Sequence, residues 1–443
     1  MKLLCLSNGH GEDAIAVRIL RQLQLLPKPP KLAALPLVGE GRAYTGLKGV
    51  PIIGPVRAMP SGGFIYMDGR QLWRDLQGGL LQLTFSQIGA VRAWAKEGGA
   101  ILAVGDIVPL LLAWMSGAPY AFVGTAKSEY YLRDETGPLK RFSADGRREI
   151  QSECVYLPPE RWLMRQRRCK AVFPRDSLTS DSLRRFSIPA FDLGNPMMDD
   201  LHSENPPALF YDPDAEINEI KRSLIVALLP GSRSPEAYAN WQLIMKAVTG
   251  MCETFYERDP VFLAAIAPGL SLEPLCEKLE VDGWRQKERQ SAAPASHPSA
   301  IKLKEKTLPP IGDSSALTFS LGNATTILSQ HAFVECLQLA DLAIAMAGTA
   351  TEQFVGLGKP AIAIPGAGPQ FTPAFAEAQS RLLGSSLILV QQPAEVAGAV
   401  RWLLRDPDRL QEIAENGQRR MGSPGAARRI AACLKELDLI LDS

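Results

Sequence analysis

The stretch that decides the fold reads Leu342-Ala-Ile-Ala-Met346-Ala-Gly348-Thr-Ala-Thr351-Glu352-Gln353 and continues to Gly358-Lys-Pro360-Ala-Ile-Ala-Ile364-Pro-Gly366. An apolar strand, a loop of small residues, a helix, a glycine stop and a second apolar strand follow one another. Strands that are apolar on both faces are typical of a parallel sheet covered by helices on both sides, so the stretch predicts a βαβ unit. Its loop lies at the carboxyl end of a strand, where open α/β sheets bind their ligands.

The totals describe a globular protein of more than one domain. A chain of 443 residues is too long for one core, and 46% hydrophobic with 21% charged residues is ordinary for a globular chain. The net charge of +1 provides no overall field to attract nucleic acid, so we expect no nucleic-acid partner.

Cysteine and histidine usage argues against a disulfide framework and against a metal site. The 7 Cys are scattered without a C-x-x-C pair, and the 4 His lie far apart. The apolar run after Lys2 is too short for a signal peptide, and the region 101–124 is interrupted by Asp106 and two prolines. We therefore expect a cytosolic protein with no metal cofactor, and peripheral contact with the cytosolic face of the inner membrane stays open.

Two runs of alternating strands and helices predict two doubly wound Rossmann-like domains that face a central cleft. We place the first domain at 1–198, a linker at 199–222 and the second domain at 223–424, with a Ser/Ala/Pro/Lys-rich mobile insertion at 286–315. A terminal helix at 425–443 is expected to pack back on the first domain.

The second domain contains two loops suited to phosphate. Gly348, Thr349, Ala350 and Thr351 bring hydroxyls and backbone N–H groups to a helix N-terminus. The first loop of this domain offers backbone N–H groups and a guanidinium for a diphosphate; it comprises Gly231, Ser232 and Arg233.

Two further features of the second domain complete this interpretation. The loop at 366–372 follows the next strand, so Gln370 can reach the same ligand. An ordinary tight turn explains each of these loops as well. In the first loop Ser234 reads as the N-cap of the following helix, with Pro235 at its first position.

The N-terminal loop has the form G-x-G-x-x-A after a strand, which is the dinucleotide fingerprint. Glu12 and Asp13 would lie against the pyrophosphate and repel it, which disfavours that interpretation. The alternative is that Asn8, Gly9 and Gly11 let the backbone approach an acceptor, with His10 and Glu12 available for proton transfer. A loop histidine that bonds only to the backbone is the plain alternative for His10.

Asp106 follows a buried strand directly. It either caps the next helix or serves as a general base for an acceptor hydroxyl. The segment 64–94 mixes aromatics, leucine and arginine, and reads either as a helix with one core face or as a surface for an amphiphilic substrate. The D-x-D pairs at 212–214 and 406–408 resemble metal ligands, but both stand at expected helix starts, where capping accounts for them.

These motifs together resemble GT-B glycosyltransferases, and within them lipid-A-disaccharide synthase and its related branch. The resemblance rests on four segments: Leu228-Leu-Pro-Gly-Ser-Arg233, Ala347-Gly-Thr-Ala350 with Gly358-Lys-Pro360, Gly194-Asn-Pro with Asp199, and Val104-Gly-Asp106. It runs through most of the chain except the insertion.

The resemblance implies inverting transfer of a sugar, N-acetylglucosamine or a relative, from a UDP donor to a lipid-linked or amphiphilic acceptor, without a metal. Gly231, Ser232 and Arg233 would contact the donor diphosphate, and the loop at 348–350 would close around it. Asp106 would match the catalytic carboxylate, and the His10 loop would face the acceptor.

Two departures limit this expectation. The family's ribose-binding glutamate falls at Gln353 here, with Glu352 one residue earlier, and neighbouring helix positions point about 100° apart. The family's N-terminal glycine loop is replaced by residues 8–13. A UDP-sugar 2-epimerase on the same architecture and a non-catalytic nucleotide- or lipid-binding homologue therefore remain as alternatives.

Overall fold

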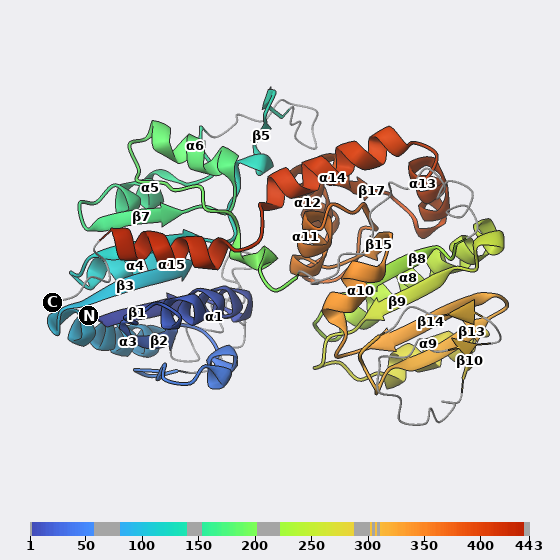
Figure 1. The fold of residues 1–443 in the computed structure, drawn as a ribbon, viewed down its shortest axis with the longest axis horizontal. Helices are drawn as coiled ribbons and strands as arrows, with labels where there is room; N and C mark the ends of the chain where they lie inside the picture. The colour runs from blue at the N-terminus through green and yellow to red at the C-terminus, as the bar shows by residue number, and fades with distance from the viewer. Residues whose placement is uncertain are drawn as a thin grey trace. The chain divides into compact units, whose positions relative to one another are not determined.

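The computed structural model describes residues 2–56, 80–139, 153–201, 222–287, 302–303, 306–307 and 311–437. The chain forms two compact units, one of Met1–Asp200 with Met421–Ser443 and the other of Leu201–Arg420. Each unit is a sheet of mostly parallel strands with helices on both faces (Figure 1). The chain passes into the second unit at 201 and returns to the first at 421, which differs by a few residues from the boundaries expected at 199 and 425.

The first unit contains a five-stranded parallel sheet in the order β2-β1-β3-β4-β7. Its strands are β1 (Lys2–Ser7), β2 (Lys31–Pro36), β3 (Gly99–Gly105), β4 (Tyr120–Gly124) and β7 (Cys169–Phe173). Its helices are α1 (His10–Gln24), α3 (Leu80–Lys96), α4 (Ile107–Met115), α5 (Pro158–Met164), α6 (Ser177–Arg185) and α15 (Ala426–Glu436). Shorter elements are η1 (Arg42–Gly46), η2 (Glu129–Tyr131), η3 (Pro196–Met198) and the pair β5 (Arg133–Asp134) and β6 (Gly137–Pro138).

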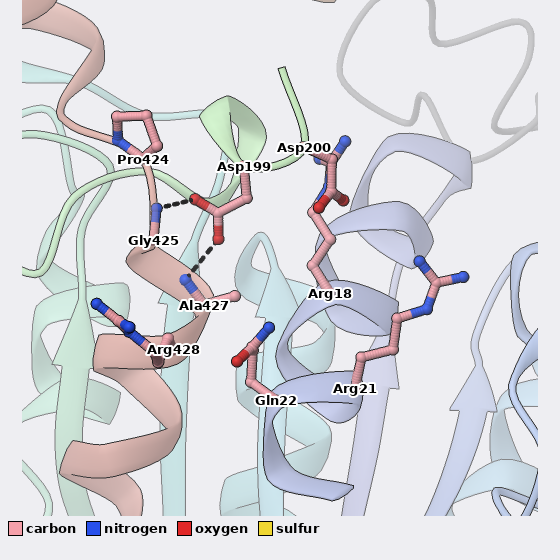
Figure 2. A pocket seen from close by; sticks show the side chains of 9 residues that line it. All are labelled: Arg18, Arg21, Gln22, Asp199, Asp200, Pro424, Gly425, Ala427 and Arg428. Carbon is pink, nitrogen blue, oxygen red and sulfur yellow. Dashed lines mark hydrogen bonds and ion pairs between the residues drawn. The ribbon is translucent and has the colours of Figure 1, made fainter. Parts of the chain in front are cut away.

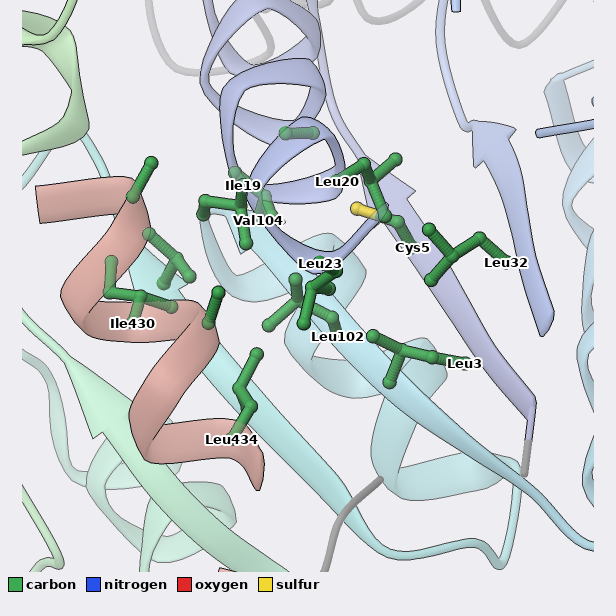
Figure 3. Packing of buried hydrophobic residues seen from close by; sticks show 14 of the residues in the cluster. Leu3, Cys5, Ile19, Leu20, Leu23, Leu32, Leu102, Val104, Ile430 and Leu434 are labelled. Atoms are coloured by element: carbon green, nitrogen blue, oxygen red, sulfur yellow. The ribbon is translucent and has the colours of Figure 1, made fainter. Parts of the chain in front are cut away.

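Alternate side chains of the first sheet enter two separate cores, as the period of a strand requires. Leu3 and Cys5 pack under α1 and α15, whereas Leu4 and Leu6 pack under α3, α4 and α5. Ile430 belongs to the first of these cores (Figure 3). The terminal helix α15 therefore covers the same sheet face as α1.

The second unit contains an eight-stranded sheet in the order β10-β13-β14-β9-β8-β15-β16-β17. Its strands are β8 (Ile225–Leu229), β9 (Val261–Ala265), β10 (Arg285–Gln286), β13 (Leu317–Leu321), β14 (Ala324–Ser329), β15 (Leu342–Ala345), β16 (Ala361–Ala363) and β17 (Leu387–Leu389), with β11 (Lys302–Leu303) and β12 (Lys306–Thr307) paired separately. The strands from β14 to β17 are parallel, and the edge strands β13 and β10 are antiparallel.

The helices of the second unit are α8 (Glu236–Thr254), α9 (Glu273–Val281), α10 (Phe333–Leu339), α11 (Thr349–Gly356), α12 (Pro373–Leu383), α13 (Val396–Leu403) and α14 (Pro407–Met421), with η4 (Tyr256–Arg258), η5 (Gly384–Ser386) and η6 (Pro393–Glu395). The βαβ unit expected at 342–366 is β15-α11-β16.

In each sheet the chain crosses from one side of its first strand to the other. In the first unit the chain moves from β1 to β2 and then returns past β1 to β3. In the second it moves from β8 through β9 to the edge strand β10, comes back through β13 and β14, and then passes β8 to reach β15. The crevice outside the carboxyl ends at such a point is where open α/β sheets bind ligands, so the loops after β1 and β3, and after β8 and β15, mark the candidate sites.

Two local features of the first unit concern the ends of its elements. The first helix begins at His10, because Gly9 turns the chain directly from strand to helix. Residues 191–193 form no strand; only an isolated bridge from Ala190 to Val172 extends the first sheet there.

The insertion expected at 286–315 is shorter at both ends. Gln286 pairs with Phe319 in the sheet, and Asp313 accepts hydrogen bonds from Ser315 and Ser329. Residues 288–301 and 308–310 lie outside the described residues, as do 202–221 of the expected linker.

The helix expected in the segment 64–94 is described from residue 80 onward, and residues 64–79 lie outside the described residues. In α3 the side chains of Leu83, Val91 and Trp94 are buried, so the described part has the expected core face. The alternative interpretation, a surface for an amphiphilic substrate, stays a prediction.

Within the described part of the chain, no helix combines the length and apolar character needed to cross a bilayer.

Candidate functional site

The first switch point begins with an abrupt turn from β1 into α1. Gly9 stands before the helix with φ 130° and ψ 170°, a conformation that L-residues rarely adopt. A Cβ at this position would also lie 2.8 Å from Oε2 of Glu12. Glu12 is thus folded back over the first turn of α1, where a dinucleotide pyrophosphate would have to lie. This geometry agrees with the charge argument against a dinucleotide.

Glu12 and Asp106 come together across β1 and β3. Both Glu12 and Asn8 pack against Gly105, where a Cβ would lie 3.3 Å from Cγ of Glu12 and 3.4 Å from Cβ of Asn8. Asp106 accepts a hydrogen bond from the backbone N–H of Val108 at 2.8 Å and so caps α4. Capping uses one carboxyl oxygen of Asp106, so the capping role and a catalytic role are compatible.

The protonation of this pair is set mainly by burial. Desolvation raises the pKa of Glu12, and the charge of Asp106 raises it further, while a bond from the Thr125 hydroxyl at 3.3 Å opposes the rise. Desolvation likewise raises the pKa of Asp106, and hydrogen bonds from Val108 and Asn8 oppose it. Two partly desolvated carboxyl groups beside each other suit proton transfer, because one can hold a proton that the other cannot.

Asn8 contributes a further polar atom to this edge. The residue is buried, and its amide oxygen Oδ1 has no hydrogen-bond partner among the described residues. A buried carbonyl oxygen without a partner is costly, so it is a natural acceptor for a hydroxyl of a bound substrate.

Three residues at this edge were not expected from the sequence. The loop after β4 supplies Thr125 and Lys127, and Lys127 forms an ion pair with the buried Glu160 at 2.5 Å. Arg175, after β7, donates to the carbonyl oxygen of Thr125 at 3.3 Å. Each of these three loop residues follows a strand of the same parallel sheet. The sequence alone does not show that they share one edge, because that depends on the order of the strands in the sheet.

The other expected residues of this loop lie less centrally. His10 and Gly11 are exposed in the first turn of α1. Asp13 is buried below the loop, where the Ser7 hydroxyl donates to it at 2.5 Å, and burial raises its pKa to about 6. The structure thus brings Asn8, Glu12 and Asp106 together, and leaves His10 at the rim.

In the second unit the side chain of Asn240 in α8 connects the loops after β8 and β15 by hydrogen bonds. Its amide nitrogen donates to the carbonyl oxygens of Pro230 at 3.0 Å and Met346 at 3.3 Å. Gly231 lies against the same place, since a Cβ there would be 3.4 Å from the Met346 oxygen. Two loops far apart in sequence therefore form one small-residue surface.

Glu236 forms hydrogen bonds with a third loop, which follows β16. One carboxylate oxygen accepts from the backbone N–H groups of Gln370 at 3.1 Å and Phe371 at 2.6 Å. Ser234 is not the N-cap expected of α8: the helix begins at Glu236, with Pro235 in the capping position. The first-turn carboxylate serves the neighbouring loop instead.

The loop after β15 is held from inside. Thr351 is buried and its hydroxyl donates to Ala347 at 2.6 Å, so it holds the loop rather than facing a ligand. The Gln379 amide donates to Ala347 at 3.1 Å and Gly348 at 3.2 Å. Thr349 is exposed at the first position of α11, and Gly348 and Ala350 are half-buried beside it.

The remaining expected donor residues lie around these loops. Ser232 is exposed, whereas Arg233 and Gln370 are half-buried. Glu352 and Gln353 are 8% and 6% exposed, so exposure does not distinguish which of them would meet a ribose.

A separate pocket of about 170 Å³ lies between α1 and the start of α15 (Figure 2). It is lined by Arg18, Arg21, Gln22, Asp199, Asp200, Pro424, Gly425, Ala427 and Arg428. Asp199 accepts from the N–H groups of Gly425 and Ala427, and Asp200 pairs with Arg18. None of the expected site residues lines this pocket.

Of the two D-x-D pairs, the one at 406–408 lies within the described residues. Asp406 accepts from the backbone N–H of Arg409 at 3.0 Å, which is the capping role. The pair at 212–214 lies outside the described residues.

Comparison of the sequence with family models and with curated proteins finds no match. Comparison of the fold finds many solved structures that span almost the whole chain. The UDP-GlcNAc 2-epimerase of Neisseria meningitidis has a TM-score of 0.53 at 12% identity, covering 98% of this chain and 99% of that one. MurG of Acinetobacter baumannii has 0.52 at 16% identity, covering 98% and 99%. CalG4, the calicheamicin glycosyltransferase, has 0.55 at 12% identity, covering 98% of each chain.

These neighbours have the GT-B fold, and so does this chain. The fold class expected from the sequence is confirmed. At such identities the likeness establishes the fold alone.

Proposed function

We propose that the protein is an inverting glycosyltransferase that moves a sugar, N-acetylglucosamine or a relative, from a UDP-sugar donor to a lipid-linked or amphiphilic acceptor. The observation that carries the proposal is the half-buried pair Glu12 and Asp106 at the switch point of the first sheet. Support comes from the neighbours, of which one was solved with UDP-GlcNAc and one is a glycosyltransferase by its description.

The donor would bind at the loops of the second unit. Gly231, Ser232 and Arg233 would contact its diphosphate, with Gly348, Thr349 and Ala350 on the other side. Gln370 and either Glu352 or Gln353 would contact the nucleoside. Asn240 and Glu236 hold these loops in place before any ligand arrives, which lowers the cost of ordering them on binding.

The acceptor would bind at the edge of the first unit. Asp106 removes the proton from the acceptor hydroxyl, whose oxygen then attacks the anomeric carbon from the face opposite the leaving UDP. Glu12 orients the hydroxyl, and Asn8 Oδ1 accepts a hydrogen bond from the sugar or acceptor. Negative charge that develops on the departing diphosphate is offset by Arg233 and backbone N–H groups, so the proposed reaction requires no metal ion.

The first experiment is a thermal-shift panel of UDP-sugars beside nicotinamide dinucleotides, with Arg233→Ala and, as a control arginine on α13 away from the site, Arg401→Ala. A UDP-sugar should raise the melting temperature of the wild type and of Arg401→Ala, and should fail to do so for Arg233→Ala. Equal shifts in all three proteins, or a shift with dinucleotides alone, would reject the proposed donor site.

The epimerase is the second candidate, because a UDP-GlcNAc 2-epimerase is among the structural neighbours. It is separated by incubating the protein with UDP-GlcNAc and no acceptor. A 2-epimer formed under these conditions supports the epimerase, whereas a donor left intact until an acceptor is added supports the transferase. A non-catalytic homologue would bind the donor and leave it unchanged with every acceptor tried.

A further inference from the structure

A buried hydrogen-bond network lies below the N-terminal loop. Ser7 ends β1, Asp13 lies in the first turn of α1 and Tyr44 belongs to η1, and these residues are 0%, 3% and 2% exposed. The Ser7 hydroxyl donates to Oδ1 of Asp13 at 2.5 Å and lies 2.6 Å from the Tyr44 hydroxyl. One serine hydroxyl therefore joins three elements of the first unit.

The direction of these hydrogen bonds follows from the protons available. An ionised carboxylate only accepts, so the single hydroxyl proton of Ser7 goes to Asp13. Ser7 then accepts from Tyr44, because its own proton is already used. Burial raises the pKa of Tyr44 well above its ordinary value, so the phenol keeps its proton and stays a donor. Tyr44 and Ser7 thus form a chain of donors that ends on the Asp13 carboxylate, and such charge-assisted chains hold their members rigidly.

This network fixes the first turn of α1, which carries Glu12. The backbone N–H of Asp13 donates to the carbonyl oxygen of Gly9 at 2.8 Å and closes that turn. The side chain of Glu12 is folded back toward Gly9, and the Thr125 hydroxyl donates to it at 3.3 Å. The turn is therefore tied to β1 and η1 through Asp13, and to the loop after β4 through Glu12.

Asp13 also contributes its charge to the site. Desolvation is the main cause of the raised pKa of Glu12; the charge of Asp106 raises it further, and the charge of Asp13 adds to the rise. Among the described residues, the titratable groups that face Asp13 are Cys5 of β1, Tyr44 of η1, and His10 and Glu12 of its own helix. Burial raises the pKa of the Cys5 thiol and of the Tyr44 phenol, so both stay neutral in the range where the carboxyl groups titrate.

We propose that Asp13 is a positioning residue for Glu12: anchored by Ser7 and Tyr44, it fixes the first turn of α1 and places a negative charge beside the Glu12 carboxyl group. A buried carboxylate lowers stability, and an apolar residue of similar size would avoid that cost. The network is thus better explained by its effect on Glu12 than by a contribution to stability. The inference rests on the role of Glu12 in the proposed transferase reaction, whereas its first two tests need neither donor nor acceptor.

The first test measures amide hydrogen exchange in the first two turns of α1, by mass spectrometry of the full chain. Ser7→Ala removes the donor to Asp13, so these amides should exchange about tenfold faster, as expected when a hydrogen bond to a charged group is lost. Tyr44→Phe removes only the outer donor and should raise the rate about threefold, and it keeps the test decisive should Ser7→Ala fail to fold. Ser180→Ala is the matched control and should leave the rate unchanged, since Ser180 is also 0% exposed and donates to a backbone oxygen of α6.

The second test measures the pKa of Glu12 by NMR titration of protein labelled with carbon-13 at the glutamate carboxyl groups, with the signal assigned by Glu12→Gln. Asp13→Asn keeps an oxygen acceptor for Ser7 and removes the charge, so the pKa of Glu12 should be lower than in the wild type. A purely structural role for Asp13 would leave this pKa unchanged. Asp176→Asn is the matched control and should also leave it unchanged, since Asp176 is 3% exposed like Asp13 and caps α6 in the same unit.

The transferase assay provides a third test. Ser7→Ala should lower kcat about tenfold and leave the donor KM unchanged, because it displaces Glu12 and not the loops of the second unit. In Asp13→Asn the fall of kcat/KM on acidification should begin at a lower pH than in the wild type, because the pKa of Glu12 is lower.

Three results would overturn the inference. One is wild-type exchange in both Ser7→Ala and Tyr44→Phe, another is an unchanged pKa of Glu12 in Asp13→Asn, and the third is a change as large in the α6 variants. A protein that shows the expected exchange and titration but transfers no sugar would instead reject the proposed function, so the two failures are distinguishable.

Discussion

At the scale of single residues, the chemistry depends on burial more than on residue type. Asp106 and Glu12 are ordinary first-turn carboxylates in the sequence, and the structure places them together under partial desolvation. Asp13, the neighbour of Glu12, is withdrawn below the loop and bonded to Ser7. The sequence nominated Asp106 and Glu12, and it named Asp13 only as a charge that would repel a pyrophosphate. It could not show which of the three would be desolvated, because desolvation depends on what the rest of the fold places around each side chain.

The pair predicts a definite pH dependence. A general base works only when ionised, and burial raises the pKa of both Glu12 and Asp106 above the ordinary carboxyl values of 4.5 and 3.8. As the pH is lowered, kcat/KM should therefore begin to fall at a higher pH than it would if the base were an exposed carboxyl group. Asp106→Asn should lower kcat by about 10²–10⁴-fold and leave the donor-induced thermal shift intact.

Asp106→Asn also tests the electrostatic coupling between Asp106 and Glu12. Removing the Asp106 charge lowers the pKa of Glu12, so any residual activity of Asp106→Asn should extend to lower pH than that of the wild type. A variant with wild-type kcat would show that Asp106 only caps α4.

At the scale of elements, the loops form the candidate ligand surface, and side chains near the helix starts hold those loops in place. The loop after β8 and the start of α8 were expected to be closed locally by Ser234, yet the structure closes them through Asn240 and Glu236, which reach other loops. A local cap can be read from neighbouring residues. The sequence does not reveal a carboxylate that accepts hydrogen bonds from a loop more than a hundred positions away, because that pairing depends on β8, β15 and β16 being neighbours in the sheet.

Glu236 should therefore act as a positioning residue for the donor. Glu236→Ala removes the single acceptor of both N–H groups at 370 and 371, and we expect the donor Kd to rise about tenfold, since hydrogen bonds to a charged group contribute about 1.5–3 kcal/mol. Calorimetric titration of the donor measures this. Glu236→Gln keeps an oxygen acceptor and should recover most of the affinity.

Glu377→Ala on α12 is the matched control, since that carboxylate is exposed and pairs only locally with Arg381. An unchanged donor Kd in Glu236→Ala, or an equal rise in Glu377→Ala, would contradict the positioning role.

At the scale of the whole molecule, the chain finishes in the unit where it began. Residues 421–443 belong with 1–200, and α15 buries Ala427, Ile430, Ala431 and Leu434 against α1 and the first sheet. Asp199 accepts from three successive N–H groups at the start of α15, which fixes the end of the first run of the chain to its last helix.

The terminal helix should accordingly contribute to the stability of the first unit. Leu434→Ala deletes a fully buried side chain and should lower the free energy of unfolding by about 2–5 kcal/mol. Urea unfolding followed by circular dichroism measures the change. Arg428→Ala, one exposed residue of the same helix, should stay within about 0.5 kcal/mol of the wild type. A Leu434 variant as stable as the wild type would mean that α15 is dispensable.

The sequence by itself determined the class of the fold and the places where function can lie. Apolar strands alternating with helices specify parallel sheets, and small-residue loops after those strands mark ligand edges, because both are properties of neighbouring residues. Only the tertiary structure decided that Glu12 meets Asp106, that Glu236 holds residues 370 and 371, and that Tyr44 meets Ser7 below the N-terminal loop. Each of these contacts joins segments that strand order and helix packing bring together, and such long-range proximity has no local signal for the sequence to display.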